Sequence, residues 1–318
     1  MATKFYKGLT PLLSQASLGG NLMGRAYIGE TLAYGAAPIG PFDPTLGGTI
    51  TPYMWYDFTD DATMEFSSAN NIIAISSKGT NTGELRQSPT AGFTSPTWEG
   101  TYTRFYGGGS THGKLSRRYS TDGTDGSSDT IFDVSNQYTT IAIFNPLFTD
   151  GNGFGPFVSI KSYNMNASPD AYNVLDIQSA AGETHTSQWS STNTAYYPRI
   201  ATEWWNGTDY AQGYSFSGAT PAGWNSWVSI QNGSTSITSG RTLNNTNVRN
   251  TGNYAISSNA NYENLVIGGR SRIDTSYAPD VYLSHVLFYD SILTTQNVDD
   301  VITNYELTSG ITLNAVTN

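Results

Sequence analysis

The chain has 318 residues, of which 13% are charged and 13% aromatic, with 33 glycines and no cysteine. This composition excludes intrinsic disorder, which is favoured by high charge and few aromatic residues. The net charge of −10 argues against binding to a nucleic-acid backbone. The absence of cysteine excludes disulfides, thiolate metal sites and cysteine nucleophiles, so we expect a large core that is stabilised by packing alone.

The first 40 residues contain two offset copies of one short phrase. Leu18-Gly19-x-x-Leu22 recurs ten residues later as Ile28-Gly29-x-x-Leu32. Each copy predicts a very short hairpin or β-arc, which is too small to bury its own apolar side and must contact another surface. Coincidence between two glycine-rich phrases is the alternative. The predicted docking residues are Leu18, Gly19, Leu22, Tyr27, Ile28, Gly29 and Leu32.

A segment rich in proline and glycine follows at residues 35–48, with three prolines and four glycines in fourteen residues. Such a segment favours irregular structure and indicates a linker. We therefore predict two parts, an N-terminal docking segment with its linker at residues 1–46 and a main domain at residues 47–318. The sequence has no apolar h-region at its start and no run of about 18 apolar residues, so we expect neither secretion nor membrane insertion.

The main domain reads as a series of short apolar or alternating segments separated by turn residues. No helical periodicity occurs between them, which excludes an alternating βα fold and favours a two-sheet β-sandwich. Asn232-Gly233 predicts a type I′ hairpin turn. The predicted strands are residues 53–58, 71–76, 101–106, 138–144, 156–160, 173–178, 200–205, 227–231, 262–267 and 281–289.

The last of these strands precedes the one clear helical pattern. Thr294 is placed as an N-cap, and Gly310 supplies a stop. Between them Val298, Val301, Ile302 and Tyr305 form one stripe with the helical period. We predict a single helix that lies against the edge or rim of a sheet.

The C-terminal third carries a family resemblance. Ile267-Gly268-Gly269, Tyr289-Asp290, Leu293 and the helix with Tyr305 occur in the order and spacing of the closing segment of concanavalin A-like lectin/glucanase jelly rolls, the laminin-G-like branch. Residues 55–58 and 224–234 resemble earlier strands of the same family. The resemblance covers roughly residues 50–310, and it implies an antiparallel all-β jelly roll with one short C-terminal helix sealing a rim.

The N-terminal segment shows a second resemblance. Residues 27–35, YIGETLAYG, resemble the leading segments of phage virion proteins that precede laminin-G-like domains. This resemblance implies a particle anchor with a projecting sandwich, located in a virion that is assembled in the host cytoplasm. The implied partners are other virion proteins, further copies of the chain and a host surface glycan.

The sequence lacks the usual catalytic motifs. Jelly-roll glycanases of the resembled superfamily use a Glu-x-Asp-x-x-Glu strand, which is missing here, and Glu99, Glu183, Glu203 and Glu263 are isolated in the sequence. Residues 108–114 match the spacing of a phosphate-binding loop, but Leu115 stands where a magnesium-binding hydroxyl is needed. We therefore expect no enzymatic activity.

An acidic turn offers carboxylates for a calcium ion at Asp122, Asp125 and Asp129. Calcium prefers such oxygen ligands, and relatives of the resembled fold often carry it on a rim loop, but an ordinary solvated turn is the alternative. The three histidines are scattered and predict no shared metal site.

Aromatic and amide residues gather between residues 189 and 224. Aromatic rings bind the C–H faces of sugars while amides and carboxylates bind their hydroxyls, although core packing or a subunit contact is the alternative. Two adjacent tryptophans on a strand must point to opposite faces, so at most one of that pair is in the core. The candidate carbohydrate-binding residues are Trp189, Tyr196, Tyr197, Trp204, Trp205, Asn206 and Asp209.

Two functions are consistent with these features. The first is a non-enzymatic virion structural protein, which is anchored by its N-terminus and presents a lectin-like domain. The alternative is a carbohydrate-binding module or degenerate glycanase outside a virion.

Overall fold

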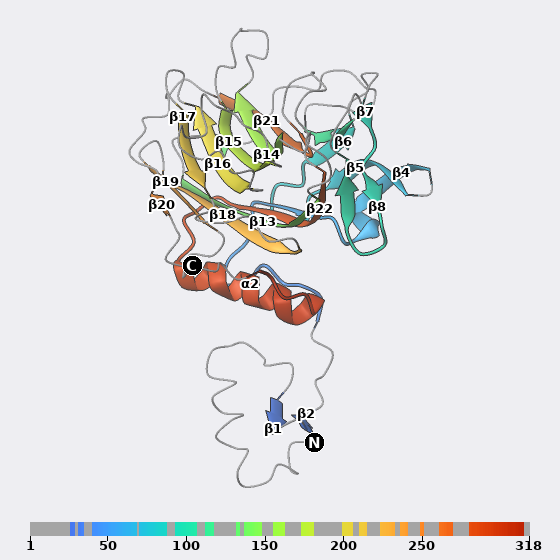
Figure 1. The fold of residues 1–318 in the computed structure, drawn as a ribbon, viewed down its shortest axis with the longest axis vertical. Coiled ribbons are helices and arrows are strands. Elements are labelled where there is room, and N and C mark those ends of the chain that lie inside the picture. Colours follow the sequence, from blue (N-terminus) through green and yellow to red (C-terminus); the bar gives the residue numbers. More distant parts are fainter. Residues whose placement is uncertain are drawn as a thin grey trace. The chain divides into compact units, whose positions relative to one another are not determined.

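A computed structural model describes part of the chain, and the statements below concern that part. The described residues are 26–28, 31–34, 40–68, 70–87, 93–106, 112–117, 132–133, 137–147, 155–162, 173–180, 199–205, 210–214, 223–232, 236–240, 249–250, 261–269 and 280–314. The fold is all-β, an antiparallel sandwich of the jelly-roll kind with one C-terminal helix, as the sequence predicts (Figure 1).

Every strand predicted from the sequence is present, and further short strands lie between them. In the first half these are β1 (Ala26–Ile28), β2 (Thr31–Tyr34), β3 (Met54–Asp57), β4 (Met64–Ser68), β5 (Asn71–Ser76), β6 (Glu84–Gln87), β7 (Phe93–Thr94), β8 (Thr97–Trp98), β9 (Thr103–Phe105), β10 (His112–Gly113), β11 (Leu115–Ser116), β12 (Phe132–Asp133) and β13 (Gln137–Pro146). A 3-10 turn, η1, covers Asp61–Thr63.

The second half contains the longer strands and the helix. These are β14 (Gly155–Ser162), β15 (Asn173–Ala180), β16 (Arg199–Trp205), β17 (Tyr210–Tyr214), β18 (Asn225–Asn232), β19 (Ser236–Gly240), β20 (Arg249–Asn250), β21 (Asn261–Ile267), β22 (Val281–Tyr289) and α2 (Thr295–Ser309).

Two runs of antiparallel pairing form the layers of the sandwich. One run is β18–β13–β22, in which the second edge of β22 pairs first with β9 and then with β3. The other run is β5–β6–β11–β21–β14–β15–β16–β17. The short strand β8 joins them through pairings with β5 and β9. Figure 1 shows β14, β15 and β16 side by side in one layer, with β13, β18 and β22 in the other.

The core lies between these two layers. It contains fully buried residues from the first layer, such as Phe144, Trp227 and Phe288, and from the second, such as Val158 and Ile267. In β22 the alternate residues Val286 and Phe288 enter this core, as the period-2 geometry of a strand requires. The intervening residues His285 and Leu287 are buried as well, so both faces of β22 are covered. This alternation fixes which strand positions face away from the core.

The strand β22 has one irregularity. Against β13, Ile143 pairs with His285 and Phe144 pairs with Leu283, so Ser284 is an extra residue, a β-bulge. On its other edge β22 changes partner at the same place, because Leu283 pairs with β9 and His285 with β3. The carbonyl oxygen of Ser284 accepts a hydrogen bond from the Phe58 N–H at 2.9 Å.

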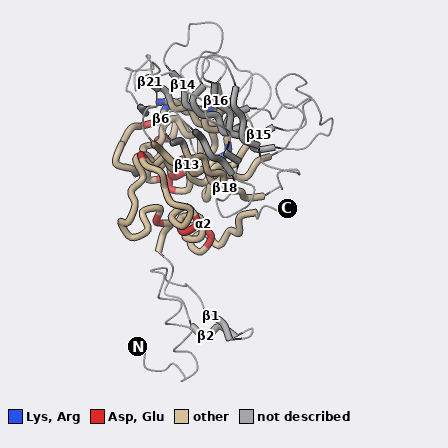
Figure 2. The backbone as a smooth tube through the Cα atoms, turned by 90° about the vertical axis from the view of Figure 1, so that its left-hand side faces the viewer, with Lys and Arg blue, Asp and Glu red and all other residues tan. Residues whose placement is uncertain are grey.

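The predicted helix is confirmed together with both of its ends. Thr294 is the N-cap, since its Oγ1 accepts a hydrogen bond from the Asn297 N–H at 3.1 Å. Gly310 has a φ of 70° and donates its N–H to the Glu306 carbonyl, which ends the helix. The predicted stripe of Val298, Val301, Ile302 and Tyr305 is buried. The helix bears acidic residues and no Lys or Arg (Figure 2). No helix in the described ranges is long and apolar enough to span a lipid bilayer.

By its contacts the chain divides into two units, residues 1–50 with 300–312 and residues 51–299 with 313–318. In the first unit, the segment 40–50 has only turns and bends, as the linker interpretation expects. The Asp43 N–H donates to Asn304 Oδ1 at 3.0 Å, and the Phe42 ring meets the Tyr305 ring edge-on at 5.6 Å. The predicted domain boundary at residue 46 stays a prediction.

Two sequence-based expectations about turns have different outcomes. In the second N-terminal phrase β1 and β2 form a hairpin, with Tyr27 opposite Leu32 and Ile28 opposite Thr31; the first phrase, with Leu18, Gly19 and Leu22, lies outside the described residues, as does Gly29. β18 and β19 form the expected hairpin, with Asn232 opposite Ser236. The turn type predicted at Asn232-Gly233 stays a prediction, because Gly233 lies outside the described residues.

Candidate functional site

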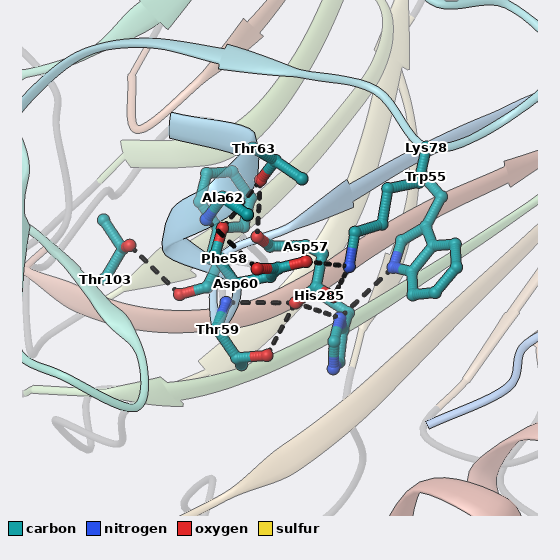
Figure 3. Close-up of polar contacts among 10 residues, drawn as sticks. All are labelled: Trp55, Asp57, Phe58, Thr59, Asp60, Ala62, Thr63, Lys78, Thr103 and His285. Atoms are coloured by element: carbon teal, nitrogen blue, oxygen red, sulfur yellow. Dashed lines mark hydrogen bonds and ion pairs between the residues drawn. The ribbon is translucent and has the colours of Figure 1, made fainter. Parts of the chain in front are cut away.

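A buried charged cluster lies where β3 and β22 meet (Figure 3). Asp57 and His285 are directly paired residues of these strands, and they are 5% and 2% exposed. The Asp57 carboxylate is fully engaged. Its Oδ1 accepts the N–H and the hydroxyl of Thr59 at 3.0 and 2.6 Å, and its Oδ2 lies 2.6 Å from Lys78 Nζ.

Lys78 belongs to the loop after β5, and the backbone holds this loop against β3. The Lys78 N–H donates to the Trp55 carbonyl at 2.8 Å, and the next residue, Gly79, packs so closely that a Cβ there would lie 2.5 Å from the Tyr53 carbonyl oxygen. Lys78 Nζ also binds the Asp60 carboxylate and lies 4.8 Å from the centre of the Trp55 ring. One lysine therefore neutralises two carboxylates.

His285 completes the cluster from β22. Its Nδ1 lies 3.3 Å from Trp55 Nε1, which donates to it, and 3.3 Å from Asp57 Oδ1. Burial, opposed by Asp57 and assisted by Lys78, lowers the pKa of His285 to about 4. The imidazole is therefore neutral at pH 7, in agreement with a ring nitrogen that accepts the indole N–H.

The charges of the cluster are held in fixed protonation states near neutral pH. Burial raises the pKa of Asp57, but His285, Lys78 and Thr59 together lower it further, so that it lies below its ordinary value. Burial lowers the pKa of Lys78, and its bonds to Asp57 and Asp60 outweigh this and raise it. The ion pairs and hydrogen bonds of Asp57, Lys78 and His285 connect β3, β22 and the loop after β5, so the cluster braces β3 against β22.

A different pattern occurs in the second layer, where strand register brings two carboxylic residues together. Asp176 of β15 and Glu203 of β16 are directly opposite, and Gln212 of β17 continues the row. Opposed residues of an antiparallel pair have Cβ atoms about 4.5–5.5 Å apart. Glu203 is therefore not isolated in the fold, which corrects the sequence-based view of it.

The register also assigns this row to a face of the layer. The neighbouring row contains Leu115, Ile267 and Val158, which are buried in the core, followed by Ile177 and Thr202. Because adjacent strand positions alternate between faces, the backbone positions of Asp176 and Glu203 form the row next to this one.

The same alternation separates the two adjacent tryptophans. Trp204 and Trp205 are adjacent positions of β16, so Trp205 and Glu203 belong to the same row of backbone positions and Trp204 to the other. Tyr210 is paired with Trp205 across to β17 and belongs to the same face. One face of β15–β17 thus carries two carboxylic residues, a glutamine and two aromatic residues at neighbouring positions.

Most of the predicted site residues lie outside the described residues. These are the carbohydrate candidates Trp189, Tyr196, Tyr197, Asn206 and Asp209 and the calcium candidates Asp122, Asp125 and Asp129. Within the described ranges, no group of three or more His, Asp or Glu side chains is arranged to hold a metal ion. The carbohydrate and calcium sites of these residues stay predictions.

Comparison with known proteins gives relatives by structure. Neither a protein-family model nor a curated protein sequence matches the chain. An arabinofuranosidase solved with arabinofuranosyl-alpha-1,2-xylobiose matches with a TM-score of 0.52 and 12% identity, over 88% of this chain and 67% of that one. A GH54 a-l-arabinofuranosidase soaked with a cyclic sulfate inhibitor gives a TM-score of 0.52 and 11% identity over the same shares.

A carbohydrate-binding module also appears among the matches. The CBM40 of the Ruminococcus gnavus IT-sialidase covers 53% of this chain and 84% of its own, with 11% identity and a TM-score of 0.39, a value on which we base no argument. The structures with TM-scores above 0.5 share the β-sandwich fold and are glycosidases. This overturns our expectation of a chain without enzymatic activity, and the chain has a fold that carbohydrate-active enzymes use.

Proposed function

We propose that the protein acts on a glycan through the face of β15–β17 that carries Asp176 and Glu203. The observation that supports this most is the register that sets these two residues directly opposite each other. Retaining glycosidases hold their two carboxyl groups about 5–5.5 Å apart, and opposed strand positions suit that separation. One residue would serve as acid and base and the other as nucleophile.

The aromatic residues of the same face supply the second part of the proposal. Trp205 and Tyr210 are opposed two pairs further along the β16–β17 ladder than Glu203 and Gln212. Aromatic rings next to carboxylic and amide groups are the usual composition of sugar sites. The similar structures include an arabinofuranosidase bound to arabinofuranosyl-alpha-1,2-xylobiose, so pentose-substituted oligosaccharides are the first substrates to test.

The test uses the full chain and its Asp176→Asn and Glu203→Gln variants. Release of 4-nitrophenol from 4-nitrophenyl a-l-arabinofuranoside and shortening of arabinofuranosyl xylo-oligosaccharides are followed over time. Each substitution is expected to lower the rate about 100-fold or more, since acid–base groups contribute on that scale. Asp290→Asn, at an exposed position after β22, is the matched control and keeps the rate. Equal rates in all four proteins would contradict the assignment.

A second proposal concerns the N-terminus. We infer attachment to a virion from the resemblance of residues 27–35, and the β1–β2 hairpin agrees with the short arc that this interpretation expects. Other virion proteins, further copies of the chain and a host glycan are the proposed partners. Deleting residues 1–40 is expected to abolish incorporation into particles, and a truncated chain that still assembles would contradict the anchor.

A further inference from the structure

A second group of aromatic residues lies on the other layer, at the end of β22 away from the charged cluster. The rings of Tyr102 and Tyr282 are 4.7 Å apart, and the rings of Tyr102 and Trp224 are 5.5 Å apart. All three side chains are half-buried, and none belongs to the core. We call Tyr102, Trp224 and Tyr282 the aromatic patch.

The patch stands on a rigid support. Arg104 and Tyr282 are paired residues of β9 and β22, and Arg104 forms a two-pronged ion pair with Asp280, with Nε and Nη2 at 3.1 and 2.9 Å from the two carboxylate oxygens. The guanidinium also lies 5.8 Å from the centre of the Tyr282 ring. A bidentate pair of this kind fixes the orientation of the side chains beside it.

The polar side-chain atoms of the patch have no hydrogen-bond partner in the part of the chain that the structure describes. Among the described residues, the hydroxyls of Tyr102 and Tyr282 and the indole N–H of Trp224 form no hydrogen bond. The same is true of the side-chain amide of Asn145, a half-buried residue of β13 that pairs with Tyr282. Aromatic faces with unused donors and acceptors are therefore grouped on one surface.

We propose that the aromatic patch, together with Asn145, is a binding site for a neutral oligosaccharide, separate from the face of β15–β17. The rings would cover the C–H faces of sugar residues, while the Asn145 amide and the tyrosine hydroxyls would bind sugar hydroxyls.

The charges around the patch select a neutral ligand. The positive charge of Arg104 is neutralised by Asp280, and Glu99 lies close enough to Tyr282 to raise the pKa of its phenol, after burial as the larger cause. An anionic glycan would meet the carboxylate of Glu99 without an unpaired cation to compensate. The occupant is thus an uncharged sugar chain.

The inference rests on the proposed glycan function only in its ligand class, and its test separates the two. Calorimetric titration of the full chain uses xylohexaose, arabinofuranosyl-substituted xylohexaose and cellohexaose as probes. Trp224→Ala is expected to weaken binding of one or more probes about tenfold or more. Asp176→Asn and Glu203→Gln are expected to keep that binding, even where they abolish cleavage.

Conservative variants distinguish a loss of binding from a loss of folding. Trp224→Phe keeps a ring and should retain most of the affinity, whereas Asn145→Ala and Tyr282→Phe should each weaken it several-fold, because each removes a hydroxyl-binding group. Glu99→Gln should leave the affinity for neutral probes unchanged. Unchanged affinity in Trp224→Ala, or no binding of any probe by a chain that still cleaves glycans, would overturn the second site and leave the proposed function intact.

Discussion

Two positions on the outer face of β22, one at its middle and one near its start, have opposite polar environments. Beside His285, in the middle of the strand, Lys78 and Thr59 both bind the Asp57 carboxylate, and Asp57 and His285 are nearly closed to solvent. At Tyr282 the hydroxyls, an indole and an amide have no partner among the described residues. Satisfied buried polar groups stabilise a fold, while unsatisfied half-exposed ones are available to a ligand. The comparison separates a brace from a binding surface.

Removing Asp57 is expected to give the largest effect. Asp57→Ala leaves Lys78 and Thr59 without their shared carboxylate, and breaking a buried pair in this way costs about 3–5 kcal/mol. Lys78 is 27% exposed, so we expect the lower end of that range in urea unfolding. Asp60→Ala is the control, because that carboxylate is 35% exposed and should contribute less than about 1 kcal/mol. Equal losses in the two variants would contradict the brace.

Lowering the pH should destabilise the charged cluster of Asp57, Lys78 and His285 before it affects the aromatic patch. The pKa of His285 is about 4 in the folded chain and 6.5 as a free group, so the unfolded chain binds the proton more readily. Stability is full above pH 6.5 and falls by about 3 kcal/mol as the pH drops to about 4. The lowered pKa of Asp57 adds a further loss at lower pH. Urea midpoints at pH 7 and pH 4 measure this, and a wild type that is equally stable at both would refute it.

The Arg104–Asp280 ion pair beside the aromatic patch should contribute less to the free energy of unfolding than Asp57 does. Arg104→Lys replaces a two-pronged pair by a single contact, and because the Arg104 side chain is 28% exposed we expect a loss of about 1 kcal/mol. Thermal unfolding measures the loss. A loss as large as that of Asp57→Ala would show that the patch is also a structural brace.

The patch hydroxyls should contribute least to stability. Tyr102→Phe removes a hydroxyl that has no hydrogen-bond partner among the described residues, so the unfolding free energy should change by less than about 0.5 kcal/mol. Thr59→Val, which removes a hydroxyl bound to Asp57 at 2.6 Å, should cost about 1.5 kcal/mol or more in the same assay. A larger loss of stability in Tyr102→Phe than in Thr59→Val would contradict the distinction between the charged cluster and the aromatic patch.

The sequence predicts local structure well where the signal is local. The strand at residues 281–289 and the caps at Thr294 and Gly310 are set by neighbouring residues, and both predictions are confirmed. The hairpin signal after residue 231 is also local, and β18 and β19 pair as it predicts. The hydrophobic period and the turn residues predict that the layers are β-sheets, but they do not predict the order of the strands in each sheet.

The sites could not be read from the sequence for the same reason. Asp176 and Glu203 are 27 positions apart, and only the β15–β16 register makes them neighbours. Tyr102, Trp224 and Tyr282 come from three distant segments, whereas the sequence drew attention to aromatic residues that are close along the chain. A pairing signal between residues 173–178 and 200–205 would have revealed the carboxylic pair.

The extra residue Ser284 explains why both sites lie on the same face of β22. Tyr282 and His285 are three positions apart, and in a regular strand an odd separation would place them on opposite faces. The bulge restores them to one face, with Leu283 and Val286 both in the core. Removing this single residue would turn the tyrosine inward and the leucine outward. Both sites therefore lie on the outer face of β22 only because of the bulge at Ser284.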